Sequence, residues 1–478
     1  MDKTERIAVV GGGITGLSCA FYLGKRLNSK NKRFRIDLIE STGRLGGVIE
    51  TRRIEEDYLL EGGPDMFFTA KPHCQDLVEE LGLKNSLIET EVRGRKSLLV
   101  SNGKLKALPD GFVMLAPSCL TSFMETEVLS FTGKLRVLME PLIPARFQGE
   151  EESVSEFVKR RFGRELLDKV AQPMVGGIYV GDVEKLSAQS TVPQFVELEK
   201  TAGSIISGLV RKVDDSSGDS SGARYKLFLS FKKGMQELVD RIQSELVNTD
   251  VMLNKKLVSM NREYSKWNLT FEIGDTEAYD AVILTIPASK IVEIEGLDER
   301  LNQELAEIPA ASSAVINFVF DRRKADFKGE GFGFVVPEIE GSRLIAASFS
   351  SQKFPGRCPE GKVIVRAFLG GAKDESVLDN DDGELCRIAL VELGRFLSIK
   401  ADPEFTWVSR WNRAMPQYLV GHKSRVSRIN AIVEDIKGFE LAGNSYNGVG
   451  IPDCIQSGKQ KAYAICDYLN QLQNSASS

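Results

Sequence analysis

The chain of 478 residues carries 62 Lys+Arg against 67 Asp+Glu, a formal net charge of −5. That length allows two or three domains with a sizeable core, and the lack of a basic excess argues against a nucleic-acid partner. The uncharged stretch 111–124 is too short for a membrane-spanning helix of about 20 residues. Seven scattered cysteines without a CxxC pair, and only two histidines, predict neither a disulfide framework nor a metal site. The first residues have no apolar signal-peptide core, so we expect a cytoplasmic protein.

The first predicted elements form a strand–turn–helix–strand unit. An apolar run over 6–10 predicts a buried strand, apolar residues at helical spacing over 14–27 predict a helix, and 36–40 predicts a second strand. This order is the unit from which parallel sheets are built. We therefore predict an α/β fold that begins with a parallel sheet.

A GxGxxG fingerprint, Gly11, Gly13 and Gly16, lies between the first strand and the helix. The first glycine permits a tight turn, the second lets the backbone approach a pyrophosphate, and the third allows the helix to pack closely on the strand. The helix N-terminus then offers N–H groups and a positive dipole to the phosphates. Glu40 ends the next strand, where it can accept hydrogen bonds from a ribose, and an acid there disfavours NADP. The pattern predicts a dinucleotide-binding site.

Two further glycine turns follow the fingerprint. Glycine makes up 43 of the 478 residues, a larger fraction than the usual share of about 7%. Several of these glycines cluster near the two ends of the chain. RLGG at 44–47 would let the backbone pass close to a cofactor and would place Arg44 near the pyrophosphate. EGGPD at 61–65 predicts another tight turn, suited to covering a ring system.

The middle of the chain changes from helical to strand-like patterns. A short amphipathic helix is predicted over 72–82, and helices dominate 110–210, where Ser153 and Glu156 form a capping-box signature. From about 225 the runs are strand-like and predict one large mixed or antiparallel sheet. These runs are 266–272, 281–286, 314–320, 331–337, 344–349 and 363–369.

A second glycine loop lies near the C-terminus, between a predicted strand over 438–441 and a helix beyond Asp453. The loop contains Gly443, Gly448 and Gly450. Taken alone, it is equally typical of a capped helix start and of a helix N-terminus aimed at the pyrimidine end of a flavin, whose reduced form carries negative charge there. Together with the N-terminal fingerprint, it favours the flavin interpretation.

These motifs together resemble the FAD-dependent amine-oxidase and phytoene-desaturase superfamily. The motifs that carry the resemblance are 11–16, Glu40 with 44–47, 61–65 and 448–454. Within that superfamily, three segments resemble the protoporphyrinogen oxidase family, and in particular its bacterial soluble branch, several of whose members act on coproporphyrinogen III. The segments are GIYVGD at 177–182, Arg410-Trp411 followed by MPQY at 415–418, and GVGIPDC at 448–454.

The resemblance covers nearly the whole chain and implies three domains, two of them discontinuous. It implies a Rossmann-like FAD-binding domain formed by 1–60, 225–290 and 406–478. It also implies a mixed-sheet substrate-binding domain formed by 61–87, 191–224 and 291–405. The third would be a helical domain over 88–190, which in relatives often contacts a membrane. For the Met-, Leu- and Phe-rich segment 112–147, we favour a role in the core of that domain over an interfacial membrane contact.

The resemblance also implies site residues. FAD would be held noncovalently at Gly11, Gly12, Gly13, Ile14, Thr15, Gly16, Glu40, Ser41, Arg44, Val48, Gly63, Pro64, Asp65, Met66, Val258, Trp411, Val449, Gly450 and Ile451. The substrate would contact Lys71, Lys96, Gly177, Val335 and Phe349. The two lysines suit propionates, although many eukaryotic relatives carry an Arg near the position of Lys96, which leaves carboxylate pairing there open. No general base is assigned, and His73 and His422 are expected to be structural.

The implied reaction is the removal of six electrons from a porphyrinogen, coproporphyrinogen III and/or protoporphyrinogen IX, in heme biosynthesis. Oxygen would be the acceptor and hydrogen peroxide the by-product. Further expected partners are a membrane surface, contacted peripherally, and a downstream heme-pathway enzyme. Two alternatives stay open: another flavin enzyme on this scaffold, such as an amine oxidase or a carotenoid desaturase, and a non-catalytic flavin- or NAD-binding scaffold.

Overall fold

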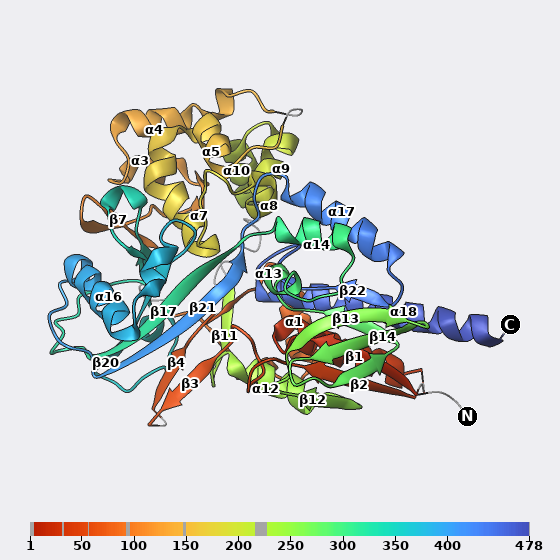
Figure 1. Ribbon diagram of the computed structural model, residues 1–478. Coiled ribbons are helices and arrows are strands. Elements are labelled where there is room, and N and C mark those ends of the chain that lie inside the picture. The colour runs from red at the N-terminus through yellow and green to blue at the C-terminus, as the bar shows by residue number, and fades with distance from the viewer. Residues whose placement is uncertain are drawn as a thin grey trace.

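The computed structural model describes residues 4–30, 33–55, 57–91, 96–146, 150–215 and 227–477. Figure 1 shows three parts: a parallel sheet with its helices at the lower right, a large twisted sheet at the left and a cluster of helices at the top. The α/β fold predicted from the sequence is confirmed.

The parallel sheet has five strands in the order β12-β2-β1-β16-β22. They are β1 (Glu5–Val10), β2 (Phe34–Ile39), β12 (Thr249–Met252), β16 (Ala281–Leu284) and β22 (Phe439–Leu441), and all adjacent pairs are parallel. These strands come from three widely separated parts of the chain, so this unit is discontinuous in sequence. Ile7 and Val9 join the core on one face, while Ala8 and Val10 join the core on the other. Burial on both faces explains why the strand is an unbroken apolar run.

Helices cover one face of this sheet and a smaller sheet covers the other. The first face packs against α1 (Ile14–Asn28), α2 (His73–Glu80), α12 (Gln236–Ser244) and α18 (Ile451–Ser477). The second packs against the antiparallel strands β13 (Leu257–Glu263), β14 (Lys266–Phe271) and β15 (Thr276–Tyr279), and against α14 (Glu299–Ala306) and α17 (His422–Asp435). The carboxyl ends of β1, β2 and β16 therefore meet at one edge, where parallel sheets bind their ligands.

The large sheet has seven strands in the order β21-β17-β20-β19-β18-β7-β8. They are β7 (Leu98–Ser101), β8 (Lys104–Ala107), β17 (Ala310–Asp321), β18 (Gly333–Val335), β19 (Leu344–Phe349), β20 (Lys362–Gly370) and β21 (Phe405–Pro416). The β18–β7 pair is parallel and the other pairs are antiparallel, so a mixed sheet is confirmed for the predicted runs from 314 onward. The runs 266–272 and 281–286 were wrongly included in it, because the first pairs within a separate three-stranded sheet and the second within the parallel sheet. Helix α16 (Asp382–Leu397) packs its apolar side on one face.

The helical part has its own apolar core. It contains α3 (Leu120–Glu125), α4 (Phe131–Leu138), α5 (Val154–Phe162), α7 (Gln172–Tyr179), α9 (Pro193–Ala202) and α10 (Ile205–Asp215). The capping box predicted at Ser153 is confirmed, because its hydroxyl accepts a bond from the Glu156 N–H and the Glu156 carboxylate accepts one from the Ser153 N–H. Within the described ranges, none of the helices has both the length and the apolar character needed to cross a membrane.

The packing differs from the predicted domain ranges in several places. Strands β7 and β8, expected in the helical part, pair within the seven-stranded sheet, and β21 joins that sheet although its residues were assigned to the FAD-binding part. Helices α9 and α10, expected beside the substrate, pack in the helical core. The predicted boundary between 224 and 225 lies outside the described residues. Pairing and burial decide where an element belongs, and neither can be seen in a linear run of residues.

Candidate active site

The glycine turn after β1 is shaped by close backbone approaches. Gly11 has a φ of +115°, and its N–H donates to the Ile39 carbonyl at 2.7 Å. A Cβ at Gly16 would lie 1.8 Å from the Gly11 carbonyl oxygen, so Gly16 allows the helix to pack on the turn. At Gly13, by contrast, the nearest atom to such a Cβ is the Gly47 Cα at 4.0 Å. The turn is therefore closely packed at Gly16 but has free space beside Gly13. No side chain caps the N-terminus of α1 there, so its N–H groups are available to a ligand.

Glu40 connects this turn to the loop that follows β2. Its Oε2 accepts a hydrogen bond from the Gly12 N–H at 2.7 Å, and its Oε1 accepts one from the Thr42 N–H at 2.8 Å. Gly12 thus orients the acid and is not itself in the cavity wall. Its Oε1 also accepts from the Ser41 hydroxyl at 3.3 Å, whereas Oε2 keeps a second lone pair with which to accept a ribose hydroxyl.

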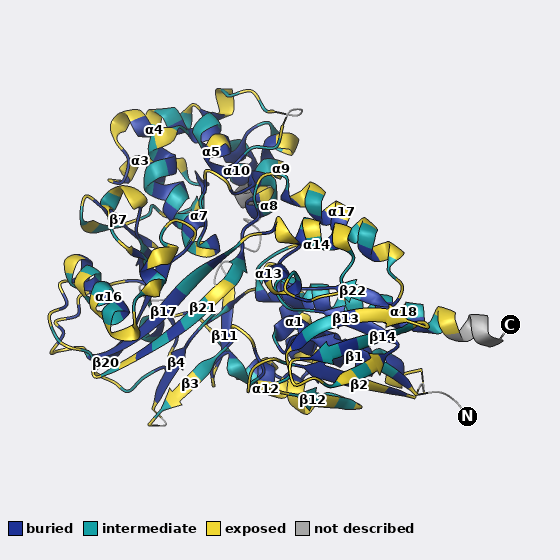
Figure 2. Ribbon diagram, in the orientation of Figure 1, coloured by how far each residue is buried: buried dark blue, intermediate teal, exposed yellow. Residues whose placement is uncertain are grey.

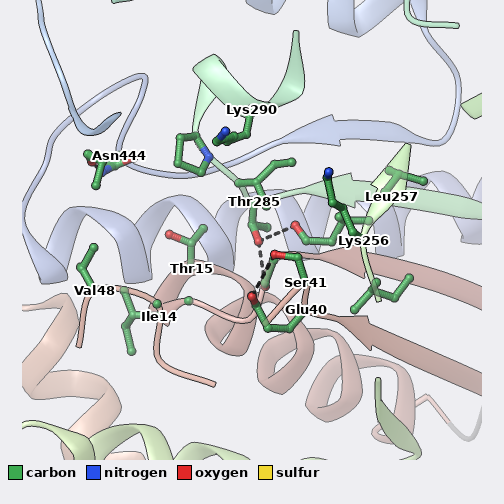
Figure 3. A pocket seen from close by; sticks show the side chains of 18 of the residues that line it. Ile14, Thr15, Glu40, Ser41, Val48, Lys256, Leu257, Thr285, Lys290 and Asn444 are labelled. Carbon is green, nitrogen blue, oxygen red and sulfur yellow. Dashed lines mark hydrogen bonds between the residues drawn. The ribbon is translucent and has the colours of Figure 1, made fainter. Parts of the chain in front are cut away.

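A cavity of about 530 Å³ opens above the turn. In Figure 3 it runs from Lys256 and Leu257 at one end, past Glu40 and Thr15, to Val48 and Asn444 at the other. The predicted FAD residues in its wall are Gly11, Gly13, Ile14, Thr15, Glu40, Ser41, Val48 and Val258. The β13–β14 register shifts at Val258, a bulge that separates its backbone from the regular ladder.

The cavity wall also contains residues that the sequence analysis missed. Thr285 follows the end of β16, and its hydroxyl donates to the Val10 carbonyl at 2.9 Å, beside the glycine turn. Lys290 and Asn444 line the same wall. For Thr285 a signal existed, because it follows an apolar run just as Gly11 and Glu40 do. For Lys290 and Asn444 we find no comparable signal.

Arg44 has a different role from the one predicted. Its guanidinium donates to the backbone carbonyls of Leu45, Gly47 and Ile49, all in its own loop. It therefore holds the RLGG turn in shape and is not among the residues that line the cavity. The sequence showed the arginine beside the glycines but not the carbonyls that satisfy it.

The turn at 61–65 closes the far end of the crevice. A Cβ at Gly63 would lie 1.8 Å from the Val48 carbonyl oxygen, so only glycine fits there. The Trp411 Nε1–H donates to the Gly62 carbonyl at 2.8 Å, which places the indole against the turn, beside Gly63. The structure thus brings together three motifs that are far apart in the sequence.

The C-terminal loop is held from behind by an aromatic pair. The Tyr418 hydroxyl accepts from the Gly448 N–H at 2.9 Å and donates to the Asn444 carbonyl. The ring of His422 stacks on Tyr418 with centroids 4.0 Å apart, and its Nε2 lies 2.9 Å from the Tyr446 carbonyl. Burial lowers the pKa of His422, which favours its neutral form. The pair therefore holds Val449 and Gly450 in position just before α18, which begins at Ile451.

A second cavity, of about 410 Å³, lies between the seven-stranded sheet and the helical part. Of the predicted residues, Met66, Lys96 and Val335 line it, and a Cβ at Gly177 would lie 3.7 Å from Val335. Its wall is mainly apolar and aromatic, with Met174, Phe228, Phe332, Phe334 and Phe368 as further members. Such a lining suits a large apolar ligand with a few charged groups.

Two predicted substrate residues lie elsewhere. The Lys71 Nζ is 2.6 Å from the Asp453 Oδ1, in the first turn of α18, and is not in the wall of the second cavity. Phe349 is fully buried and packs edge-on against Phe327 with centroids 5.2 Å apart. Phe368, on the adjacent strand β20, lines the cavity instead. Side chains on strands alternate between faces, and the sequence did not show which aromatic faced the cavity.

Asp65 is buried beneath the 61–65 turn rather than exposed to the crevice. Its Oδ2 lies 2.9 Å from the Lys353 Nζ and 3.0 Å from the Arg366 Nη1. Burial alone would raise the pKa of Asp65, but these two cations hold it below its usual range. The turn is therefore anchored to the sheet by an ionised carboxylate.

The first cavity fits a dinucleotide cofactor. Its wall combines glycine backbone, the open N-terminus of α1 and an acid placed for a ribose. Cys454 also reaches this wall, and burial raises its pKa to about 12, so its thiol stays protonated. A Rossmann-type crevice bordered by a large apolar cavity is the arrangement of a dinucleotide-dependent oxidoreductase.

The chain belongs to the flavin-containing amine oxidoreductase family, whose model matches residues 14–466. FAD is the cofactor that this family membership assigns to the crevice. The chain is 34% identical to a coproporphyrinogen III oxidase of Bacillus subtilis, over 98% of this chain and 99% of that protein. It is 31% identical to a coproporphyrinogen III oxidase of Staphylococcus aureus, over 97% and 99% of the two chains. A crystal structure of a candidate protoporphyrinogen oxidase from Exiguobacterium sp. 255-15 superposes with a TM-score of 0.86, at 29% identity over 98% and 100% of the chains.

Proposed function

We propose that the protein oxidises a porphyrinogen to the porphyrin in heme biosynthesis, with molecular oxygen as the final electron acceptor. One observation carries the proposal: the flavin crevice and the apolar cavity meet at a single turn. Gly63 packs on Val48 in the crevice wall, and Met66, three residues further on, lines the apolar cavity. A macrocycle in that cavity would present its edge to the cofactor. The names of the relatives support the same substrate class.

In this proposal the residues of the chain bind and orient the substrate, and bound FAD supplies the hydride-accepting chemistry. Val335 and Phe368 would contact the faces of the macrocycle, while Lys96 at the rim would meet a propionate. The methylene-bridge hydrogen would leave as hydride and a ring N–H as a proton, and we assign no side chain as the base. The predicted crevice residues would hold FAD without a covalent bond, so denaturation should release all of the flavin.

We propose coproporphyrinogen III, with four carboxylates, as the preferred substrate over protoporphyrinogen IX, with two. The two relatives named coproporphyrinogen III oxidases support this choice, as does the presence of two lysines, Lys96 and Lys353, in the cavity wall. Each additional carboxylate would gain a charge-assisted contact where a lysine can reach it.

The test is a comparison of initial rates on both porphyrinogens in air, followed by porphyrin fluorescence and peroxide release. Heat-denatured protein corrects for autoxidation of the substrates. We expect three molecules of peroxide for each porphyrin formed and a higher kcat/KM for coproporphyrinogen III. A preparation that oxidises amines but neither porphyrinogen would establish the alternative, another enzyme on this scaffold.

We also propose a peripheral membrane contact on the helical part. The segment 112–147 was expected to lie in the core, but the structure divides it: Val137 is buried, whereas Phe131, Leu135 and Met139 are 67%, 42% and 51% exposed along one side of α4. Phe147 lies outside the described residues. In Figure 2, α4 carries exposed and intermediate as well as buried residues. An apolar stripe of this kind is typical of interfacial contact.

Sedimentation with phosphatidylglycerol-containing vesicles tests the membrane contact. Replacing Phe131, Leu135 and Met139 by Ser should reduce the bound fraction severalfold without changing turnover. Val391→Ser is the matched control, because Val391 is 60% exposed on α16, away from this stripe. Equal vesicle binding by the triple variant and the wild type would contradict the proposal.

A further inference from the structure

Three cationic side chains are buried together beneath the 61–66 turn. Lys353, Arg357 and Arg366 are only 6%, 1% and 2% exposed. Lys353 and Arg366 share a single carboxylate, Asp65, through the two ion pairs of 2.9 and 3.0 Å. The Arg366 Nη2 also donates to the Gly63 carbonyl, so the cluster contacts the turn that joins the two cavities.

The charges in this cluster do not balance. The second acid, Glu61, accepts bonds from the Met235 N–H at 2.9 Å and the Thr51 hydroxyl at 2.7 Å, and burial raises its pKa to about 7. The Arg357 Nη2 donates to the Ser230 hydroxyl at 2.8 Å, but its Nε and Nη1 have no hydrogen-bond partner among the described residues. The three cationic side chains therefore outnumber the carboxylates, of which only Asp65 is firmly ionised.

Buried charge without a counter-ion is costly, and an anion that enters the site would remove that cost. The cluster adjoins a route for such an anion, because Lys353 forms part of the wall of the second cavity together with Met66 and Phe368. Arg366 and Phe368 are two residues apart on β20, so they lie on the same face of the strand. The excess positive charge thus lies directly behind the apolar wall.

We propose that Lys353, backed by Arg357 and Arg366, receives a carboxylate of the substrate at the inner end of the second cavity. This inference rests on the proposed function and adds a specificity-determining residue to it. Lys96, at the rim, has a side chain that is 56% exposed, and its Nζ lies 3.7 Å from the Glu330 carboxylate. Water would therefore weaken an ion pair between Lys96 and a substrate carboxylate. Lys353, with a side chain only 7% exposed, would bind a carboxylate with little competition from water.

The test compares two ligands and three variants with the wild type by porphyrin fluorescence titration of the FAD-loaded enzyme. The ligands are coproporphyrin III, which keeps four carboxylates, and its tetramethyl ester, which has none. For Lys353→Met we expect at least tenfold weaker binding of the acid and less than twofold change for the ester. Lys353→Arg, which keeps the charge, should bind the acid within threefold of the wild type. Lys96→Met is the matched control and should weaken acid binding by no more than threefold.

The outcomes separate this inference from the proposed function. If the wild type oxidises coproporphyrinogen III but Lys353→Met binds acid and ester as tightly as the wild type, the inference is overturned and the proposed function stands. Equal weakening of acid and ester would also overturn it, since that indicates lost shape rather than lost charge. If the wild type neither binds these porphyrins nor oxidises coproporphyrinogen III, both fail. Should Lys353→Met lose its flavin, the double variant Asp65→Asn/Lys353→Met, which removes one charge of each sign, permits the same comparison.

Discussion

The cofactor crevice and the substrate cavity are built in different ways. The crevice is shaped by backbone: Gly11, Gly16 and Gly63 fit only because they have no Cβ, and their motifs are contiguous in the sequence. The cavity is shaped by side chains such as Met174 and Phe368, which come from elements far apart in the chain. A site made of backbone is thus specified locally, whereas a site made of side chains depends on tertiary packing.

The largest expected effect on function, complete loss of the cofactor, comes from a change in the crevice. In Gly16→Ala the new Cβ would lie 1.8 Å from the Gly11 carbonyl oxygen and 2.8 Å from the Thr285 Oγ1, so the backbone of the turn would have to shift. We expect loss of all bound flavin and an unfolding free energy lower by about 3 kcal/mol. The flavin-to-protein absorbance ratio measures the bound flavin, and a denaturant titration measures the unfolding free energy. Gly383→Ala is the control, because the nearest atom to its Cβ would be the Asp381 Oδ1 at 3.3 Å, and this variant should remain yellow. A Gly16→Ala protein with a full complement of flavin would contradict this account of the crevice.

The next prediction separates core from cavity with two aromatics on adjacent strands. Phe349→Ala should lower the unfolding free energy by about 3–5 kcal/mol, because Phe349 is fully buried, and should leave KM of the surviving enzyme unchanged. Phe368→Ala should raise KM at least fivefold with a smaller loss of stability, since Phe368 lines the cavity. Denaturant titrations measure the unfolding free energy of both variants, and steady-state kinetics measure their KM. The reverse pattern would mean that the two faces of the sheet have been assigned the wrong way round.

A third prediction concerns pH and the turn shared by the two regions. Burial raises the pKa of Glu61 to about 7 in the folded state, above its ordinary value of about 4.3 in the unfolded chain. The folded protein therefore binds an extra proton between these values, and its stability should fall by up to about 3 kcal/mol as the pH rises through that window. Glu61→Gln should flatten this slope when unfolding free energy is measured from pH 4.5 to 7.5. An unchanged slope would show that Glu61 is ionised in the folded state.

The smallest effect is expected outside both sites. Ser153→Ala removes one half of the capping box at the start of α5, which should cost about 1 kcal/mol. Thermal unfolding measures this loss, while flavin content and KM should stay at wild-type values. A change in KM larger than twofold would show that the helical part is coupled to the substrate cavity.

The sequence was sufficient to predict the first two strands of the parallel sheet, the glycine turn and Glu40, because each depends on residues close together in the chain. It could not show that Arg44 binds its own loop, since the carbonyls that satisfy it are defined only by the folded turn. It could not place Phe349 and Phe368 on opposite sides of the sheet, because both lie in apolar runs without clear alternation. Lys353 was missed for a similar reason. A lone lysine carries no signal until Asp65, 288 residues away, is brought against it.

The central claim is that a porphyrinogen in the apolar cavity delivers electrons to a flavin in the crevice. Anaerobic mixing of the purified protein with coproporphyrinogen III tests it most directly, with the visible absorbance of oxidised flavin as the measured quantity. We predict loss of that absorbance within a single turnover, and its return together with porphyrin fluorescence when air is admitted and allows further flavin cycles. A flavin that stays oxidised in the presence of excess porphyrinogen would contradict the account.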